Sequence, residues 1–190
     1  MKVKTKIIKQ ALSETSSNGS VDLDALLKTV DQYVKTEARS DMVAQNIKDL
    51  LSHSFIFSNK EMCSKLIDEI GADHYFKEMV PKIFFGRRHG HTTGVCKFIS
   101  ENPELRVVVV TSQHLMAESF RYALAQFENV STVPVFALTK DIPMANLRGV
   151  DVILVDEYPA PGSAGYDNFL RLIYNSTKLG FPLITLGTMF

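Results

Sequence analysis

The sequence of 190 residues contains no tryptophan, two cysteines and no formal net charge at pH 7. Cys63 and Cys96 are far apart and form no CxxC pair, which argues against a zinc site and against a disulfide framework. We therefore expect two reduced thiols in a cytosolic protein. A net charge of zero excludes a global electrostatic field that would draw the chain to nucleic acid or to a membrane.

Long hydrophobic runs are also missing. No segment approaches the roughly 20 apolar residues of a membrane-spanning helix, so we expect no membrane partner. The lysine-rich first nine residues lack the apolar stretch of a signal peptide. These absences predict a cytoplasmic location, which is the host cytoplasm if the protein is viral.

Proline and glycine are scarce in the first part of the chain. All seven prolines and eight of the ten glycines lie at or beyond Pro81. We therefore predict a small helical domain at residues 1–80 and an α/β domain at residues 81–190. The first domain should hold a short helix before a polar loop at 13–20, and further helices that the apolar spacing places at 23–34, 40–51, 61–70 and 72–80. Ser58 and Glu61 have the spacing of a capping box for the third of these.

After Pro81 the pattern alternates between strands and helices. Arg106–Thr111 is a continuous β-branched run, as expected of a parallel strand buried on both faces. Shorter strands are predicted at 82–85, 132–138, 151–157 and 182–188, with Pro134 placing the second of these at a sheet edge. Helices are predicted after Ser112 and near Asp167–Leu179. This alternation predicts a parallel sheet that binds its ligands at the carboxyl ends of the strands.

The segment from Phe84 to Thr93 reads as a strand, a glycine turn and the start of a helix. This is the local design of a loop that binds phosphate through backbone N–H groups and a helix N-terminus. The candidate binding residues of this loop are Gly86, Arg88, His89, Gly90, His91, Thr92 and Thr93. The Thr92 hydroxyl stands where a P-loop holds Mg²⁺. The alternative is a turn that needs its glycines for geometry and binds nothing.

Two further strand ends carry polar side chains. Asp156 and Glu157 follow the apolar run of 152–155, where an aspartate can hold Mg²⁺ and a glutamate can activate water. Thr185 and Thr188 could sense a γ-phosphate from a neighbouring strand. Solvated strand ends and ordinary strand residues are the alternatives for these two pairs.

The run Gly86-Arg87-Arg88-His89-Gly90-His91-Thr92-Thr93 resembles the variant Walker A motif of phage large terminase ATPases, R-x-x-G-K-[ST]. Val152–Glu157 resembles the Walker B strand with its catalytic glutamate, and Leu183–Thr188 is loosely similar to the coupling motif. Superfamily 2 helicase-type ATPases share most of this pattern. The resemblance implies a RecA-like, ASCE-type P-loop NTPase core with bound ATP, or another NTP, and Mg²⁺. It also implies viral or phage nucleic-acid handling such as DNA packaging, with DNA or RNA, a homo-oligomer or a motor complex as partners.

The resemblance assigns a role to each matching residue. Glu157 would activate water, Arg87 would stabilise the γ-phosphate, and Asp156 and Thr92 would hold the metal. His91 departs from the pattern, because it replaces the lysine that reaches the β- and γ-phosphates as a permanent charge. Arg87 or Arg88 could supply the missing charge.

Three functions remain open on these grounds. The first is a Mg²⁺-dependent NTPase, which the glutamate favours. The second is a degenerate relative that binds a nucleotide or another phosphate without efficient hydrolysis, which His91 favours. The third is an interaction protein whose α/β core is only a scaffold. The breaker-rich stretch 158–165 beside the carboxylates is a lid, a contact for a partner or a plain connector.

Overall fold

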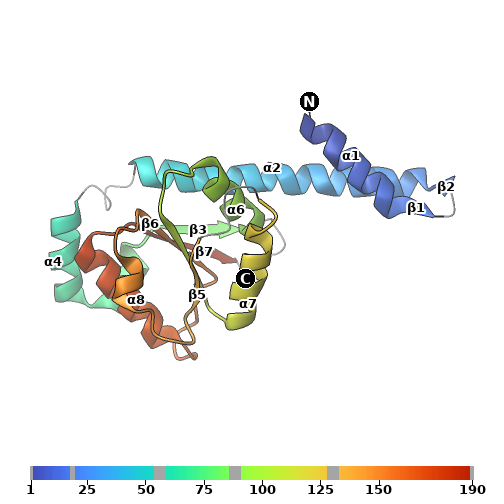
Figure 1. Ribbon diagram of the computed structural model, residues 1–190. Helices are drawn as coiled ribbons and strands as arrows, with labels where there is room; N and C mark the ends of the chain where they lie inside the picture. Colours follow the sequence, from blue (N-terminus) through green and yellow to red (C-terminus); the bar gives the residue numbers. More distant parts are fainter. Residues whose placement is uncertain (1, 18–19, 54–58, 86–90, 128–132, 189–190) are drawn as a thin grey trace.

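The computed structural model describes residues 2–17, 20–53, 59–85, 91–127 and 133–188. Its centre is a five-stranded sheet in which every neighbouring pair of strands is parallel (Figure 1). The strand order is β3-β7-β6-β4-β5. The strands are β3 (Lys82–Phe85), β4 (Val107–Thr111), β5 (Val135–Ala137), β6 (Val152–Asp156) and β7 (Leu183–Thr188). The predicted parallel α/β fold is confirmed, and β5 is an edge strand as its proline indicates.

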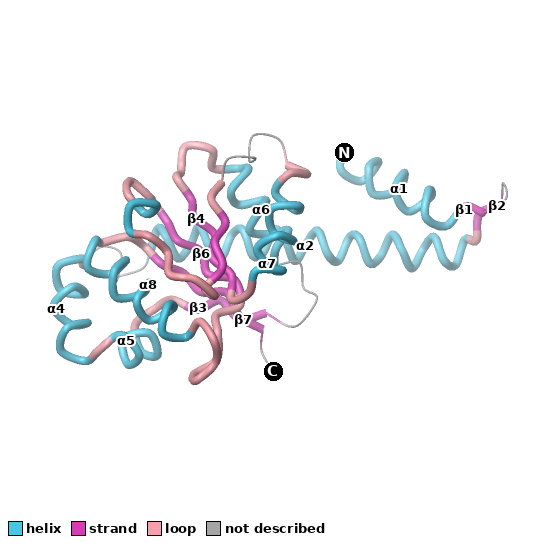
Figure 2. The backbone as a smooth tube through the Cα atoms, turned by 60° about the horizontal axis from the view of Figure 1, so that its bottom comes forward, coloured by secondary structure: helices cyan, strands magenta, loops and turns pink. Residues whose placement is uncertain are grey.

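Helices cover both faces of the sheet (Figures 1 and 2). One face carries α2 (Leu23–His53), α6 (His91–Glu101) and α7 (His114–Leu124). The other face carries α4 (Lys60–Ile70), α5 (Ala72–Glu78) and α8 (Tyr166–Leu179). A short 3₁₀ turn, η1 (Met144–Leu147), precedes β6.

The first helix lies apart from the sheet. α1 (Lys2–Thr15) packs along the amino-terminal half of α2, and the two-residue strands β1 (Ser16–Ser17) and β2 (Ser20–Val21) join them. Figures 1 and 2 both show this hairpin standing out from the α/β core, with β1 and β2 at its far end.

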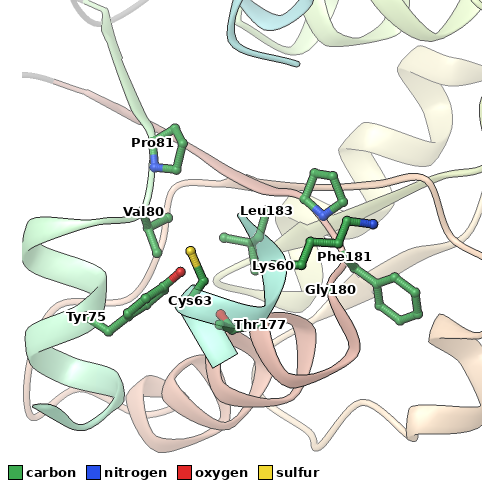
Figure 3. A pocket seen from close by; sticks show the side chains of 10 residues that line it. Lys60, Cys63, Tyr75, Val80, Pro81, Thr177, Gly180, Phe181 and Leu183 are labelled. Carbon is green, nitrogen blue, oxygen red and sulfur yellow. The ribbon is translucent and has the colours of Figure 1, made fainter. Parts of the chain in front are cut away.

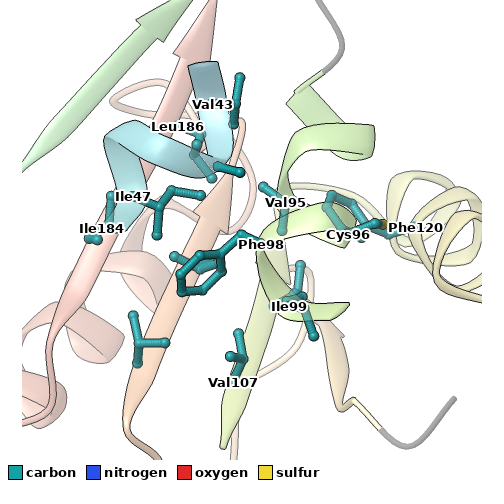
Figure 4. Close-up of a cluster of buried hydrophobic side chains, with 14 of the residues drawn as sticks. Val43, Ile47, Val95, Cys96, Phe98, Ile99, Val107, Phe120, Ile184 and Leu186 are labelled. Atoms are coloured by element: carbon teal, nitrogen blue, oxygen red, sulfur yellow. The ribbon is translucent and has the colours of Figure 1, made fainter. Parts of the chain in front are cut away.

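Two clusters of buried hydrophobic side chains fill the space between helices and sheet. In the first, Val43 and Ile47 of α2 meet Val95 and Phe98 of α6 above the sheet (Figure 4). The second, on the opposite face, joins residues such as Ile67 to Phe169. Both clusters therefore draw side chains from either side of the predicted boundary at residue 80.

The amino-terminal helices differ in extent from the expectation. The two helices predicted at 23–34 and 40–51 are one continuous helix, α2. The residues between Val34 and Ser40 include no glycine or proline, so nothing breaks the backbone ladder there. The hydroxyls of Thr36 and Ser40 donate to the carbonyls four residues earlier and so add no competing turn.

Smaller differences concern helix ends. α1 reaches Thr15, so part of the polar stretch 13–20 is helical rather than loop. The last amino-terminal helix ends at Glu78 rather than Val80. Ser58 of the predicted capping box lies outside the described residues, and the Glu61 carboxylate instead pairs with Lys65 at 3.0 Å. Among the described helices, none has the length and apolar content needed to cross a membrane.

Candidate functional site

The carboxyl edge of the sheet brings together the strand ends that the sequence singled out. β7 lies between β3 and β6, with Phe85 level with Thr188 and Asp156 level with Leu186. Since neighbouring strands lie about 4.8 Å apart, the end of β6 is about 10 Å from β3. The chain leaves β3 towards the predicted phosphate loop at this edge. Gly86, Arg87, Arg88, His89 and Gly90 themselves lie outside the described residues.

The described part of the predicted loop is the start of α6. His91 is the first residue of this helix and is buried, with 8% of its surface exposed. Thr92 is half-buried and Thr93 is exposed. The first N–H groups of a helix have no partner within the helix, and with the helix dipole they favour an anion. The amino end of α6 therefore favours an anion, as the amino end of a helix does in general.

Gly94 sets how closely α6 approaches α2. A Cβ built on Gly94 would lie 2.5 Å from Cβ of Val43 and 2.9 Å from the carbonyl oxygen of Ser40. Only glycine allows this contact. The first turn of α6 is thus packed directly against the long helix α2.

Asp156 ends β6 on the face that α6 covers. Side chains alternate along a strand, and Val152 and Leu154 belong to the cluster beneath α2 and α6, so Asp156 points to the same face. Only 5% of the residue is exposed, and its Oδ1 has no hydrogen-bond partner among the described residues. Burial, and then the charge of Glu157, raise the pKa of Asp156 to about 7.

Cys96 locates this carboxyl relative to α6. The pKa of the buried Cys96 thiol is raised to about 12, chiefly by burial and then by the negative charge of Asp156. Cys96 also belongs to the cluster that Val152 and Leu154 of β6 share with α6. Both groups are therefore buried between β6 and α6.

Glu157 has an unusual backbone. Its φ of 51° is the only positive value at a non-glycine residue among the described residues. Its N–H donates to the Leu186 carbonyl at 2.9 Å, and the next residue, Tyr158, stacks on Phe169 with ring centroids 5.6 Å apart. Phe76 meets the Tyr158 ring edge-on at 4.9 Å. The left-handed turn at Glu157 therefore separates two side chains, because Asp156 faces α6 while Tyr158 is anchored on the α5 and α8 face.

Thr185 lies away from this edge. It is fully buried in the first half of β7, and its hydroxyl donates to the Pro81 carbonyl at 3.2 Å. This hydroxyl ties β7 to the start of β3. Thr188, at the carboxyl end of β7, pairs with Phe85 and therefore lies at the edge of the sheet where the predicted phosphate loop begins.

A cleft of about 740 Å³ opens next to Glu157. Its walls come from the segments that follow β4, β5 and β6, and from Gly187 of β7; they include Ser112, Gln113, His114, Leu115, Thr139, Glu157 and residues 158–161, 163 and 164. No lysine or arginine stands among these described lining residues. The stretch 158–165 thus contributes one wall of a cleft at the carboxyl edge of the sheet.

Residues 112–115 and Thr139 also line this edge, although their sequence does not single them out. One signal was present, because both follow predicted strands directly, and segments after parallel strands meet at one edge. The Thr111 hydroxyl donates to the Gln113 carbonyl at 2.9 Å and so fixes the turn that carries His114 into the cleft wall.

The residues present fit a magnesium ion held together with a phosphate. Asp156 offers a buried oxygen that nothing else in the described residues uses. Mg²⁺ takes one or two carboxylates, with phosphate oxygens and water completing its octahedron. No group of three or more His, Cys, Asp or Glu side chains that could hold a metal by themselves occurs in the described parts of the chain. The described side chains therefore suit a metal ion whose remaining ligands come from a bound phosphate better than a metal ion held by the protein alone.

A second hollow, at the amino end of the strands, is too small for such a ligand. It measures about 30 Å³ and is lined by residues that include Lys60, Cys63, Tyr75, Pro81 and Leu183 (Figure 3). This volume holds about one water molecule. Burial raises the pKa of the Tyr75 hydroxyl, so this group stays neutral.

No protein-family model matches the chain, and no curated protein matches it.

Proposed function

We propose that this protein binds a nucleoside triphosphate, ATP in the first instance, together with Mg²⁺ at the carboxyl edge of the sheet, and hydrolyses it. The observation that carries the proposal is the buried Oδ1 of Asp156, which has no hydrogen-bond partner among the described residues and lies on the face of β6 that α6 covers. A buried carboxyl that lacks a partner is costly for folding alone, and such groups concentrate at functional sites. A cation accompanying phosphate would give this oxygen its partner.

The strand order supports the proposal. The strand leading to the glycine loop and the strand ending in Asp156 are separated only by β7. Phosphates over the amino end of α6 would therefore lie at the same edge of the sheet as both carboxylates. The motif resemblance to terminase and helicase-type ATPases agrees with this arrangement, and a role in viral nucleic-acid handling rests on that resemblance.

Each residue has a defined task in this proposal. Thr92 and Asp156 hold the metal, and the amides at the start of α6 with His91 bind phosphate. Bound Mg²⁺ neutralises charge on the phosphates. Glu157, which lines the cleft beside the end of β6, orients and deprotonates the attacking water. Arg87 stabilises the γ-phosphate.

Binding is tested by calorimetric titration with ATP, GTP and ADP, each with and without Mg²⁺. We expect Mg²⁺-dependent binding, strengthened by His91→Lys because lysine adds a permanent charge at the phosphates. If neither form binds any of the three nucleotides, the proposal fails and the scaffold function remains.

Hydrolysis is tested with Glu157→Gln. This change should lower turnover by about 100-fold or more while nucleotide binding persists, because the amide cannot accept the proton of water. Glu104→Gln is the matched control, since Glu104 is exposed before β4 at the opposite edge of the sheet. Unchanged turnover in the Glu157 variant would remove this residue from catalysis.

A second candidate function is phosphate or nucleotide binding without efficient hydrolysis. The buried His91 at the lysine position is the observation that favours it. Binding of Mg²⁺·ATP by the wild type with no phosphate release above background would select this function.

A further inference from the structure

An apolar stripe runs along the exposed side of the hairpin formed by α1 and α2. Leu23, Leu27 and Val34 of α2 are 69%, 66% and 47% exposed, and Val30 is half-buried. At 3.6 residues per turn these four side chains fall within an arc of about 60°. They face away from both clusters of the α/β core, whose first member is Val43.

α1 extends the same face. Gln10 donates to the Tyr33 hydroxyl at 3.0 Å, which sets these two residues on one flank of the hairpin. Ile8, 47% exposed, and Leu12 point about 160° away from Gln10 and its neighbour Glu14 on α1. On α2, the half-buried Leu26 separates Tyr33 from the apolar stripe. Ile8 and Leu12 therefore lie on the same flank as the stripe.

The two groups also lie at the same height. The Tyr33 hydroxyl accepts a hydrogen bond from Gln10 and donates one to Glu14, so the second half of α1 lies beside the part of α2 around Tyr33. Ile8 and Leu12 are neighbours of Gln10 along α1 and therefore lie alongside the part of α2 that carries Val34. We call the combined surface of Ile8, Leu12, Leu23, Leu27, Val30 and Val34 the hairpin face.

We propose that the hairpin face pairs with the hairpin face of a second copy of this chain, in antiparallel orientation, to form a four-helix bundle. A two-fold axis midway between Leu27 and Val30 sets Leu23 opposite Val34 of the second copy and Leu27 opposite its Val30. Such a surface is self-complementary, as a two-fold interface requires.

The charges beside the face select this occupant. The charges along the flank of α2 alternate in sign, in the order Asp24, Lys28, Asp31 and Lys35. This flank therefore favours neither a uniformly acidic nor a uniformly basic partner. In the antiparallel pairing Asp24 falls within one helical turn of Lys35 of the second copy. Lys35 is paired with its own Asp31 at 2.6 Å, and Asp24 adds a second carboxylate to the same ammonium group.

The area is sufficient for a weak, reversible dimer. The four most exposed side chains of the face leave roughly 400 Å² of apolar surface on each copy, which is the size of the largest, often functional, apolar patch on a typical monomer. Two copies with their polar rims would bury roughly 1,300 Å², near the lower limit of specific interfaces.

The first test is the mass of the full-length protein by light scattering, from about 5 to about 200 µM. We expect the mass to rise from 21.3 kDa towards twice that value at the highest protein concentrations. Such weak affinity is in keeping with an interface of about 1,300 Å². Leu27→Glu should keep the protein at 21.3 kDa throughout. Leu115→Glu, at a 75% exposed position on α7, is the matched control and should dimerise like the wild type. A monomeric wild type, or a Leu27 variant that still dimerises, would overturn the proposal.

The orientation is tested by cross-linking. The native cysteines Cys63 and Cys96 are buried and leave the surface free for engineered thiols. The double variant Leu23→Cys/Val34→Cys should form a disulfide-linked dimer under mild oxidation, whereas each single variant should not, because identical residues lie roughly 16 Å apart along the helix axis. Cross-linking of a single variant, or none in the double variant, would overturn the antiparallel pairing.

Discussion

The buried carboxyl of Asp156 makes the stability of the protein depend on pH. The folded chain holds the Asp156 proton up to about pH 7, whereas an exposed aspartate releases it near the ordinary pKa of 3.8. The folded state therefore binds more protons between these values, so this group's contribution to stability falls as pH rises through 7. At about 1.4 kcal/mol per pH unit, the loss reaches at most about 4 kcal/mol.

Asp156→Asn should remove this slope. We expect the stability of Asp156→Asn relative to the wild type to be greater at about pH 8 than at about pH 5. The reason is that asparagine carries no charge to bury. Urea denaturation of both proteins at the two pH values, without Mg²⁺, measures the difference. Glu157→Gln should reduce the slope only in part, since burial outweighs the Glu157 charge in raising the pKa. An equal pH dependence in wild type and Asp156→Asn would contradict the assignment.

Backbone strain at Glu157 predicts a second effect on stability. A left-handed conformation costs a residue with a Cβ about 1–2 kcal/mol, and glycine avoids this cost. Glu157→Gly should therefore be more stable than Glu157→Ala by about 1 kcal/mol, the reverse of the usual order. Denaturant titration of the two variants gives the comparison, and a more stable alanine variant would show that the turn is unstrained. Both variants should lack hydrolysis.

Among the secondary-structure elements, the contact of α6 with α2 depends on one glycine. In an exposed helix Gly→Ala stabilises by about 1 kcal/mol, but at Gly94 the added Cβ would lie 2.5 Å from Val43. We expect Gly94→Ala to destabilise the protein by about 1–3 kcal/mol through overpacking.

The neighbouring change Thr93→Ala, at an exposed position of the same helix, is the control and should be nearly neutral. Urea denaturation distinguishes the two variants. A stabilised Gly94→Ala protein would mean that α6 can move away from α2 without loss.

The sequence predicted elements well where a pattern was local. The run of valines at 107–110 and the strand ending in Asp156 were both found, because burial on two faces leaves a continuous apolar signature. The continuity of α2 was missed, because the apolar residues on its first half face α1 and solvent, whereas those on its second half face the sheet. Periodicity reports which face is buried, but not whether the backbone is interrupted.

The site was predictable only as separate strand ends. The sequence placed Asp156 and Glu157 after a strand, but the order β3-β7-β6 depends on contacts between distant segments. Neither the burial of Asp156 nor the left-handed turn at Glu157 has a local signal, since both result from how α6 and the Tyr158 ring pack. The cleft walls at 112–115 also arise only when the strands are aligned.

For the molecule as a whole, the α/β core does not depend on the hairpin. Both core clusters contain only residues from Val43 onward. Removing residues 1–36 should therefore leave a folded protein whose thermal midpoint lies within about 5 °C of the wild type. Circular dichroism during heating measures the midpoint, and nucleotide titration of the fragment checks the site. A fragment that fails to unfold cooperatively would show that the core needs α1 or the first half of α2.

Because α2 is one unbroken helix, a small tilt near its contact with α6 displaces its far end by a larger distance. The helix is 31 residues long, or roughly 46 Å, and its pivot is the close contact with Gly94 next to the start of α6. From this pivot to Leu23 the helix measures roughly 30 Å, so a tilt of about 5° swings the far end by roughly 3 Å. A change in the position of α6 upon ligand binding at the proposed site would thus be magnified at the far end of α2. Spin labels placed there would report this displacement more sensitively than labels at the proposed nucleotide site.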